Sequence, residues 1–283
     1  MADVTVIKEK KVGFIGGGNM AQAIGFGLVK KGVLKSQNIW VSCRTEQSLS
    51  IWKSFGIHTT LKNHEVIKNC DIIFLSIKPH ILDEALATCK NSIYKFEGKL
   101  YVSVIVGVSL DALDSKLQSI DSAPRIIRSM PNTPMMVAEG ITVYCSLRTT
   151  EEDEFIISTL FSQLGICEKI GEGFITSAGG LSGCGPAYAY LIIEGLADGA
   201  VRKGVPRASA LRFAAQVLIG AGKMVLETGK HPGQLKDEVT SPNGSTICGI
   251  HELEKGGVRA SMMNAVEAAV KRSDEIADIM NKK

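Results

Sequence analysis

The chain has 283 residues, 45% of them hydrophobic, and a formal net charge of only +3. This length is enough for one large or two modest domains, each with its own core. The near-neutral charge gives no indication of nucleic acid or a membrane surface as a partner, and the longest apolar runs, such as Asp71–Ile77, are too short to span a bilayer.

The first predicted elements are a strand, a glycine-rich turn and a helix. The apolar run Val12–Ile15 predicts the strand, residues 16–21 have the pattern Gly-x-Gly-x-x-Ala, and residues 22–31 are compatible with a helix. Gly16 permits a tight turn, and Gly18 allows the backbone to approach a pyrophosphate. An ordinary turn is the alternative, but the position between strand and helix favours binding of a nicotinamide or flavin dinucleotide.

Strand and helix patterns then alternate as far as about residue 165. Strands are predicted at 38–42, 71–77, 100–106, 125–128 and 141–145. Helices are predicted at 46–55, 81–89, 110–117 (capped by Ser109) and 151–164. This alternation predicts an α/β, Rossmann-type, doubly wound parallel sheet, which we assign to residues 1–168.

Beyond Gly173 the pattern changes to long stretches rich in Ala, Gly and Leu. Pro186–Lys203, Ala208–Thr228 and Gly257–Asn281 have helical spacing, and no convincing strand lies between them. Residues 169–283 are therefore predicted to form an all-α domain. Its apolar surface is large for so small a bundle, which favours a homo-oligomer.

Three residues at the end of the predicted strand at 38–42 bear on the choice of cofactor. In a Rossmann fold an acidic residue here accepts hydrogen bonds from a free ribose 2′-hydroxyl, but this chain has Ser42, Cys43 and Arg44. Hydroxyls and a guanidinium suit a phosphate dianion, so NADPH is favoured over NADH, which stays an alternative donor. A solvated loop arginine is the other interpretation.

Four later segments each have a functional and a purely structural interpretation. Residues 76–79 lie at the carboxyl end of the strand predicted at 71–77 and either contact the cofactor or end that strand, and residues 104–107 leave the same choice. Residues 128–134 are favoured as a stiff loop on the cofactor side over a structural turn. Residues 181–188 place Pro186 at a helix start whose amides either face the active cleft or are merely capped.

The clearest pattern of the second half is Thr240-Ser241-Pro242-Asn243-Gly244-Ser245-Thr246, directly before a helix pattern. Turn-forming residues end where the helix begins, so unpaired amides and hydroxyls gather at one point. This suits an anion of carboxylate size, and an ordinary Ser/Thr cap is the alternative. His231, which precedes Pro232, is favoured as a surface histidine over a proton donor.

The sequence shows no Cys–His, Ser–His or paired-carboxylate arrangement, and no metal site is predicted. Its seven cysteines are scattered without Cys-x-x-Cys spacing, which favours reduced, mostly buried thiols. The N-terminal residues lack the composition of a signal or transit peptide, so a cytoplasmic location is expected. Hydride transfer to an activated acceptor such as a protonated imine suits this set of residues better than acid–base chemistry.

At these residues the chain closely resembles pyrroline-5-carboxylate reductases. The resemblance covers nearly the whole length through GFIGGGNMA, SIKPH, RSMPNTP, SGCGPAY, HPGQLKDEVTSPNGST and NAVEA. It implies NAD(P)H-dependent reduction of 1-pyrroline-5-carboxylate to L-proline, the last step of proline biosynthesis. It also implies a helical domain that interlocks into homodimers, which in this family often associate further into decamers.

Carried over by position, the resemblance also assigns site residues. Its cofactor contacts fall on Ile15, Gly16, Gly17, Gly18, Asn19, Met20, Cys43, Arg44, Asn63, Ser76, Ile77, Lys78, Pro79, Val104, Ile105 and Val106. Its substrate contacts fall on Ser241, Gly244, Ser245 and Thr246, with the Thr246 hydroxyl near the ring nitrogen as the catalytic contact.

The chain departs from the family pattern at two positions. It has Asn243 where a second glycine is usual, and Cys184 where serine or another small residue is common. Asparagine tolerates positive φ better than other non-glycine residues, so the turn is expected to survive.

Two other functions remain open at this level. One is reduction of a different cyclic imine or of a deazaflavin substrate on the same architecture. The other is an NADP(H)-binding sensor without catalysis. The intact set from Ser241 to Thr246 argues against the sensor, which would have no use for it.

Overall fold

The computed structural model describes residue 7, residues 9–90 and residues 95–281. The chain forms two compact units. The first contains the residues up to Gly183 together with those from Ala269 onward, and the second is Cys184–Ala268. The division into domains 1–168 and 169–283, expected from the sequence, stays a prediction.

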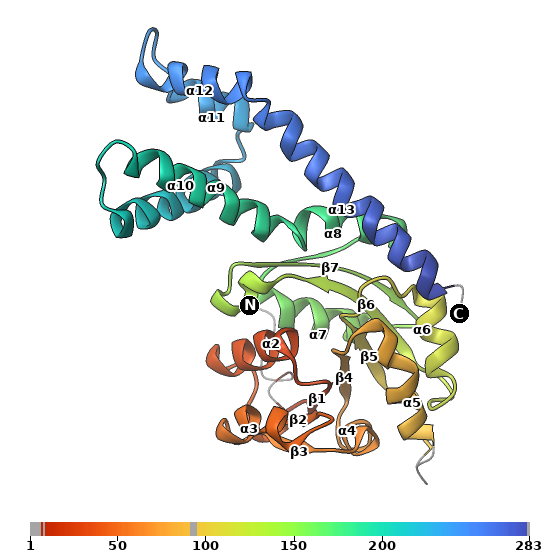
Figure 1. The fold of residues 1–283 in the computed structure, drawn as a ribbon. Coiled ribbons are helices and arrows are strands. Elements are labelled where there is room, and N and C mark those ends of the chain that lie inside the picture. The colour runs from red at the N-terminus through yellow and green to blue at the C-terminus, as the bar shows by residue number, and fades with distance from the viewer. Residues whose placement is uncertain (1–6, 8, 91–94, 282–283) are drawn as a thin grey trace. The chain divides into compact units, whose positions relative to one another are not determined.

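The first unit is built on an eight-stranded sheet with the order β3-β2-β1-β4-β5-β6-β7-β8. The strands are β1 (Val12–Ile15), β2 (Ile39–Ser42), β3 (His58–Thr60), β4 (Ile72–Leu75), β5 (Leu100–Ser103), β6 (Arg125–Pro131), β7 (Gly140–Leu147) and β8 (Gly165–Lys169). Strands β1–β6 are mutually parallel, whereas β6 and β7 are antiparallel and β8 follows the direction of β7. The order 3-2-1-4-5-6 is that of dinucleotide-binding folds, which confirms the predicted doubly wound sheet (Figure 1).

Helices cover both faces of this sheet. They are α2 (Asn19–Lys30), α3 (Glu46–Ser54), α4 (Asn63–Asn69), α5 (Leu82–Lys90), α6 (Leu110–Leu117), α7 (Glu151–Ser162) and α8 (Glu172–Ser182), with 3₁₀ turns at η1 (Ser36–Asn38), η2 (Pro79–Ile81) and η3 (Thr133–Val137). Neighbouring strand residues belong to opposite cores: Phe14 packs with α2, α3 and α7, and Ile15 packs with α4, α5, α6 and α8. Burial on both faces explains why these strands have continuous apolar runs.

Local capping fixes several of these helices where the sequence predicts them. The Ser109 hydroxyl accepts the Ala112 N–H at 3.2 Å and starts α6. Thr150 and Asp153 form a reciprocal capping box at the start of α7. The expected strand at 100–106 is shorter in the structure, because the Ile105 N–H turns back to the Ser103 hydroxyl at 3.2 Å.

The second unit is helical throughout its described residues, as predicted. It contains α9 (Gly185–Val201), α10 (Arg207–Thr228), α11 (Pro232–Glu238), α12 (Ser245–Lys255) and the first half of α13 (Val258–Asn281). Helices α9 and α10 pack through Ala197, Ala210 and Ala214, and the Tyr188 hydroxyl donates to the Ala265 carbonyl at 3.2 Å. Small side chains at this contact let the two helices approach closely.

Much of α10 presents apolar side chains to solvent in the single chain. By length and composition alone it would be able to cross a membrane, with 22 residues and a mean hydropathy of 1.3 over an 18-residue window. Arg212, Gln216 and Lys223 interrupt the segment, so it has no long uninterrupted apolar run in the sequence. One such helix is weak support for a membrane span, and an exposed apolar surface of this kind equally marks an interface between protein chains.

Candidate functional site

A cavity of about 890 Å³ lies at the carboxyl ends of β1, β2 and β4. Strands β1 and β4 are neighbours although they are not consecutive, and ligands of open α/β sheets bind where the strand order reverses in this way. Most of the predicted cofactor residues line it, namely Ile15, Gly16, Gly17, Gly18, Ser42, Cys43, Arg44, Asn63, Ser76, Ile77 and Lys78. Asn19, Met20, Pro79, Val104, Ile105 and Val106 are not part of its lining.

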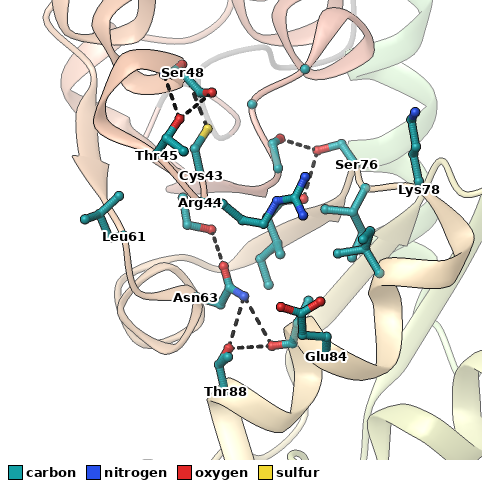
Figure 2. A pocket seen from close by; sticks show the side chains of 18 of the residues that line it. Cys43, Arg44, Thr45, Ser48, Leu61, Asn63, Ser76, Lys78, Glu84 and Thr88 are labelled. Carbon is teal, nitrogen blue, oxygen red and sulfur yellow. Dashed lines mark hydrogen bonds between the residues drawn. The ribbon is translucent and has the colours of Figure 1, made fainter.

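The glycine-rich turn after β1 has the conformation that its motif predicts. Gly16 has φ +95°, and a Cβ at this position would lie 2.5 Å from the Ser76 carbonyl oxygen, so only glycine fits. The Ser76 hydroxyl donates to the Gly16 carbonyl at 2.7 Å (Figure 2). At Gly18, by contrast, a Cβ would meet nothing within 4 Å, which leaves room for a ligand against the backbone.

Backbone donors at this turn are free to bind an anion. Gly18 is the N-cap of α2 and has no side-chain cap, and the N–H groups of Gly18 and Asn19 have no hydrogen-bond acceptor among the described residues. The Gly17 N–H interacts with Cys43 instead. The N-terminus of α2 adds the positive end of its dipole. Together these features fit a phosphate or pyrophosphate group.

Ser42 and Asn63 are joined to each other rather than directed to a ligand. Ser42 is fully buried, and its hydroxyl donates to Asn63 Oδ1 at 2.7 Å. Asn63 Nδ2 donates to the Ala85 carbonyl at 3.2 Å and to the Thr88 hydroxyl at 3.1 Å (Figure 2). The structure therefore does not support the expected contact of the Ser42 hydroxyl with a 2′-phosphate, because that hydroxyl is already used to hold Asn63.

Arg44 is the cation that the end of β2 presents to the cavity. Figure 2 shows its guanidinium directed into the space between Ser76 and Glu84, and it forms no ion pair within the described part of the chain. Cys43 beside it is half-buried, and burial raises the pKa of its thiol, so this residue brings no charge. Thr45 then caps α3 by accepting the Ser48 N–H at 3.3 Å. This fixes where the loop ends.

Several cavity residues were not predicted from the sequence. Gln22 comes from α2, while Glu84, Ala85 and Thr88 come from α5. Residues 84 and 88 are four apart and thus share one face of that helix. This spacing, directly after residues 76–79, is the signal that identifies them.

The loops after β5 and after β6 have structural partners of their own. Gly107 has φ +81°, and a Cβ there would lie 3.3 Å from Ile276 of α13, so its close approach is to that helix. Asn132 is buried, donates to the Ser182 carbonyl at 2.8 Å and accepts the Ile141 N–H at 2.9 Å. For Asn132 these bonds favour the structural interpretation over a contact with the cofactor.

The second unit contains the predicted anion site. Asn243 has φ +57°, which confirms that asparagine supports the turn, and the Gly244 N–H donates to the Ser241 carbonyl at 3.1 Å. A Cβ on Gly244 would overlap the Ser241 hydroxyl, so any other residue there would force that side chain to move. Helix α12 begins at Ser245 with no side-chain cap.

The polar groups at this helix start are uncommitted. The hydroxyls of Ser241, Ser245 and Thr246 make no hydrogen bond to any described residue, and these side chains are exposed. Exposed hydroxyls beside the unpaired amides of a helix start can receive a carboxylate. An ordinary capped start, the alternative from the sequence, would have used one of these side chains.

The other candidates have structural roles or none that the geometry reveals. His231 is the N-cap of α11, where its Nδ1 accepts the Gly233 N–H at 3.0 Å, so the structure supports a cap and not a proton donor. All seven cysteines are unbridged, and burial raises the pKa of Cys70 to about 12 and that of Cys89 to about 11. No cluster suited to a metal ion occurs among the described residues.

Comparison with known proteins agrees with this geometry. The family model for pyrroline-5-carboxylate reductase dimerisation matches residues 172–276, and the model for NADP oxidoreductase, coenzyme F420-dependent, matches residues 11–107. A pyrroline-5-carboxylate reductase of Arabidopsis thaliana is 46% identical over 270 residues, which covers 94% of this chain and 95% of that protein.

Two solved structures are similar along almost the whole chain. The pyrroline carboxylate reductase of Plasmodium falciparum, determined with NADP bound, has a TM-score of 0.82 and 31% identity over 96% of this chain and 99% of its own. A pyrroline-5-carboxylate reductase from Coxiella burnetii has a TM-score of 0.83 and 33% identity, covering 95% and 98% of the two chains.

Proposed function

The chain belongs to the pyrroline-5-carboxylate reductase family, and on that premise we propose that it reduces 1-pyrroline-5-carboxylate to L-proline with NADPH. The observation that carries the proposal is the pair of sites described above. One is a glycine turn with free amides beside an arginine, and the other is an uncapped helix start with three hydroxyls, all of them without partners within the described ranges of the chain.

The residues of the first unit fit the phosphates of NADPH. The Gly18 and Asn19 amides face a pyrophosphate, and Arg44 faces a 2′-phosphate, a charge-assisted contact that NADH does not offer. Bound there, NADPH supplies the hydride that reduces the imine carbon. The cavity has the size and the apolar Ile15 and Ile77 walls of a dinucleotide site.

The residues of the second unit fit the substrate. The amides at the start of α12 and the Ser241 hydroxyl hold the substrate carboxylate, which fixes the orientation of the ring. The Thr246 hydroxyl hydrogen-bonds the ring nitrogen as it changes from iminium to amine. The proton on that nitrogen comes from solvent or is already present on the substrate, so no side chain has to act as an acid.

Thr246→Ala is expected to lower kcat and kcat/KM about fivefold to a hundredfold, the equivalent of one hydrogen bond of roughly 1–3 kcal/mol. The substitution removes the hydroxyl but keeps the backbone amide, so carboxylate binding largely persists. A contact that strengthens during hydride transfer affects kcat as well as kcat/KM. Steady-state kinetics of the purified variant measure this, and NADPH affinity should not change.

Two further variants control for general effects of the substitution. Thr246→Ser retains a hydroxyl, so its kcat and kcat/KM should fall less than those of Thr246→Ala. Thr228→Ala removes a hydroxyl that donates to the Met224 carbonyl and accepts the Lys230 N–H at the end of α10, and it should behave as the unaltered protein. Unchanged kcat and kcat/KM in Thr246→Ala would leave the helix start as a binding site only.

The experiment that tests the function itself is the oxidation of NADPH on addition of pyrroline-5-carboxylate, with proline identified as the product. Other cyclic imines and an oxidised deazaflavin serve as competing acceptors, because the deazaflavin-related match is confined to residues 11–107. Faster turnover of another acceptor would replace the proposed substrate, and NADPH binding without turnover of any acceptor would favour the sensor.

The assembly and the location of the protein are part of the same proposal. The match to a dimerisation domain and the exposed apolar faces of α10 support a homodimer, and we extend this to a decamer only through the family resemblance. The unbridged state of all seven cysteines supports a reducing compartment, for which we propose the cytoplasm.

A further inference from the structure

The carbonyl oxygen of Gly17 accepts two side-chain hydrogen bonds from inside the protein. Trp52 Nε1 donates at 3.1 Å and Gln22 Nε2 donates at 2.9 Å. Trp52 is a fully buried residue of α3, and Gln22 is a partly buried residue near the start of α2. Donors from two different helices thus hold a single peptide group of the phosphate-binding turn.

The orientation of that peptide decides where the next amide points. In a trans peptide the C=O and the following N–H lie on opposite sides, so a Gly17 carbonyl held toward Trp52 and Gln22 turns the Gly18 N–H the other way. A Cβ on Gly17 would lie 2.6 Å from both Trp52 Nε1 and Cys43 Sγ, whereas the space beside Gly18 is open. The closed side of the peptide is therefore protein, and the open side is the cavity.

Three consecutive glycines make this restraint necessary. Glycine offers little steric resistance to rotation of its neighbouring peptide groups, so Gly16-Gly17-Gly18 alone would populate several orientations. The Gly16 carbonyl is held by the Ser76 hydroxyl, and the Gly17 carbonyl by Trp52 and Gln22. With both carbonyls fixed, the amides are oriented before a ligand arrives, and the cost of ordering them on binding is avoided.

We propose that Trp52 and Gln22 are positioning residues for the pyrophosphate of the dinucleotide. They act through the Gly17 carbonyl and keep the Gly18 amide directed into the cavity. Trp52 is not part of the cavity lining, and Gln22, which is, has its amide nitrogen engaged by that carbonyl. The inference depends on the proposed function only in that the ligand is NADP(H). Binding of NADPH without turnover of any imine would remove the proposed reaction and leave this inference in place.

The test removes each donor while retaining the size of the side chain. Trp52→Phe and Gln22→Met are each expected to weaken NADPH binding about threefold to tenfold, because the second donor still holds the carbonyl. In the double variant, NADPH affinity should fall by more than the product of the two single fold-changes, since no donor to the Gly17 carbonyl then remains. Equilibrium titration gives the dissociation constants, so the measurement does not depend on activity.

A fragment without a pyrophosphate separates positioning from a general structural effect. Adenosine 2′-monophosphate retains the adenosine and the 2′-phosphate, and its affinity should change by less than about twofold in all three variants. Trp40→Phe is the matched control, because Trp40 stacks on His58 with ring centroids 4.7 Å apart, away from the turn. It should bind both ligands as the unaltered protein does.

Two results would overturn the inference. Equal weakening of NADPH and adenosine 2′-monophosphate would mean that Trp52 and Gln22 merely support the cavity wall, and unchanged NADPH affinity in the double variant would mean that the turn needs no restraint. Should Trp52→Phe fail to fold, Gln22→Met alone must show the NADPH-specific loss, and its absence would refute the proposal.

Discussion

Phe213→Glu is expected to separate the assembled protein into single chains and to lower turnover of pyrroline-5-carboxylate by more than about a hundredfold. Phe213 lies on α10 and is 60% exposed in the single chain. The buried apolar side chains of the second unit are the small residues Ala197, Ala210 and Ala214, at least among those that the structure describes. So small a core leaves the large apolar side chains of α10 to be covered by another copy of the chain.

The size of the effect follows from the symmetry of a homodimer. Each interface would receive two glutamates, one from each chain, and an unpaired charge buried in an apolar contact costs several kcal/mol. We propose that the helical half completes the active site only in the oligomer. Loss of the assembly should therefore also lower turnover. Light scattering measures the assembly, circular dichroism the fold, and steady-state kinetics the activity.

Phe155→Glu on α7 is the matched control, since it places the same charge at a helical phenylalanine that is 41% exposed in the first unit. It should leave the assembly intact. A Phe213→Glu protein that stays assembled would remove α10 from the interface. One that is monomeric yet fully active would show that assembly and catalysis are separate.

The sequence predicts the centre of this sheet well and its edges poorly. Strands β1 and β4 are buried on both faces, so each appears as an uninterrupted apolar run. The unpredicted strands β3 and β8 form the two ends of the sheet, and none of their residues is buried. They are strands because a neighbour pairs with them, which no local pattern reveals.

Helix α8 was missed for a related reason. Its eleven residues include Gly173, Gly179 and Gly180, which lower the helix propensity of the segment. Packing supplies what propensity does not, since Ile175 belongs to the core of the first unit and Gly179 lies directly against Met130. Only the folded structure brings these partners together.

In the candidate site, too, local motifs are predictable from the sequence, whereas contacts between segments are not. The turn at Gly16–Gly18, Arg44 after β2 and the start of α12 were predictable, because each is a local motif or follows from the family resemblance. The link between Ser42 and Asn63, and the two donors on the Gly17 carbonyl, join segments separated by 21, 35 and 5 residues. These links depend on how the helices pack. The sequence pattern therefore predicts a ligand contact for Ser42, whereas in the structure its hydroxyl donates to Asn63.

Arg44→Ala is expected to weaken the use of NADPH about tenfold to a hundredfold and to leave NADH little affected, because it removes a charge-assisted contact worth roughly 1.5–3 kcal/mol. Only NADPH has the 2′-phosphate that this contact requires. With Ser42 engaged by Asn63, Arg44 is the charged residue at the end of β2 that can make it. Kd and kcat/KM for both cofactors, measured side by side, give the selectivity directly.

The geometry of the guanidinium also enters this prediction. Arg44→Lys keeps the positive charge but loses the planar guanidinium. Its preference for NADPH over NADH should therefore be weaker than that of the unaltered protein and stronger than that of Arg44→Ala. Lys53→Ala on α3 removes a nearby cation that pairs with Glu46 outside the cavity, and it should leave the selectivity unchanged. Equal losses for NADPH and NADH in Arg44→Ala would show that Arg44 shapes the cavity without recognising the 2′-phosphate. Any preference for NADPH would then have to arise from another cavity residue, for which the lysine in the lining, Lys78, is the candidate.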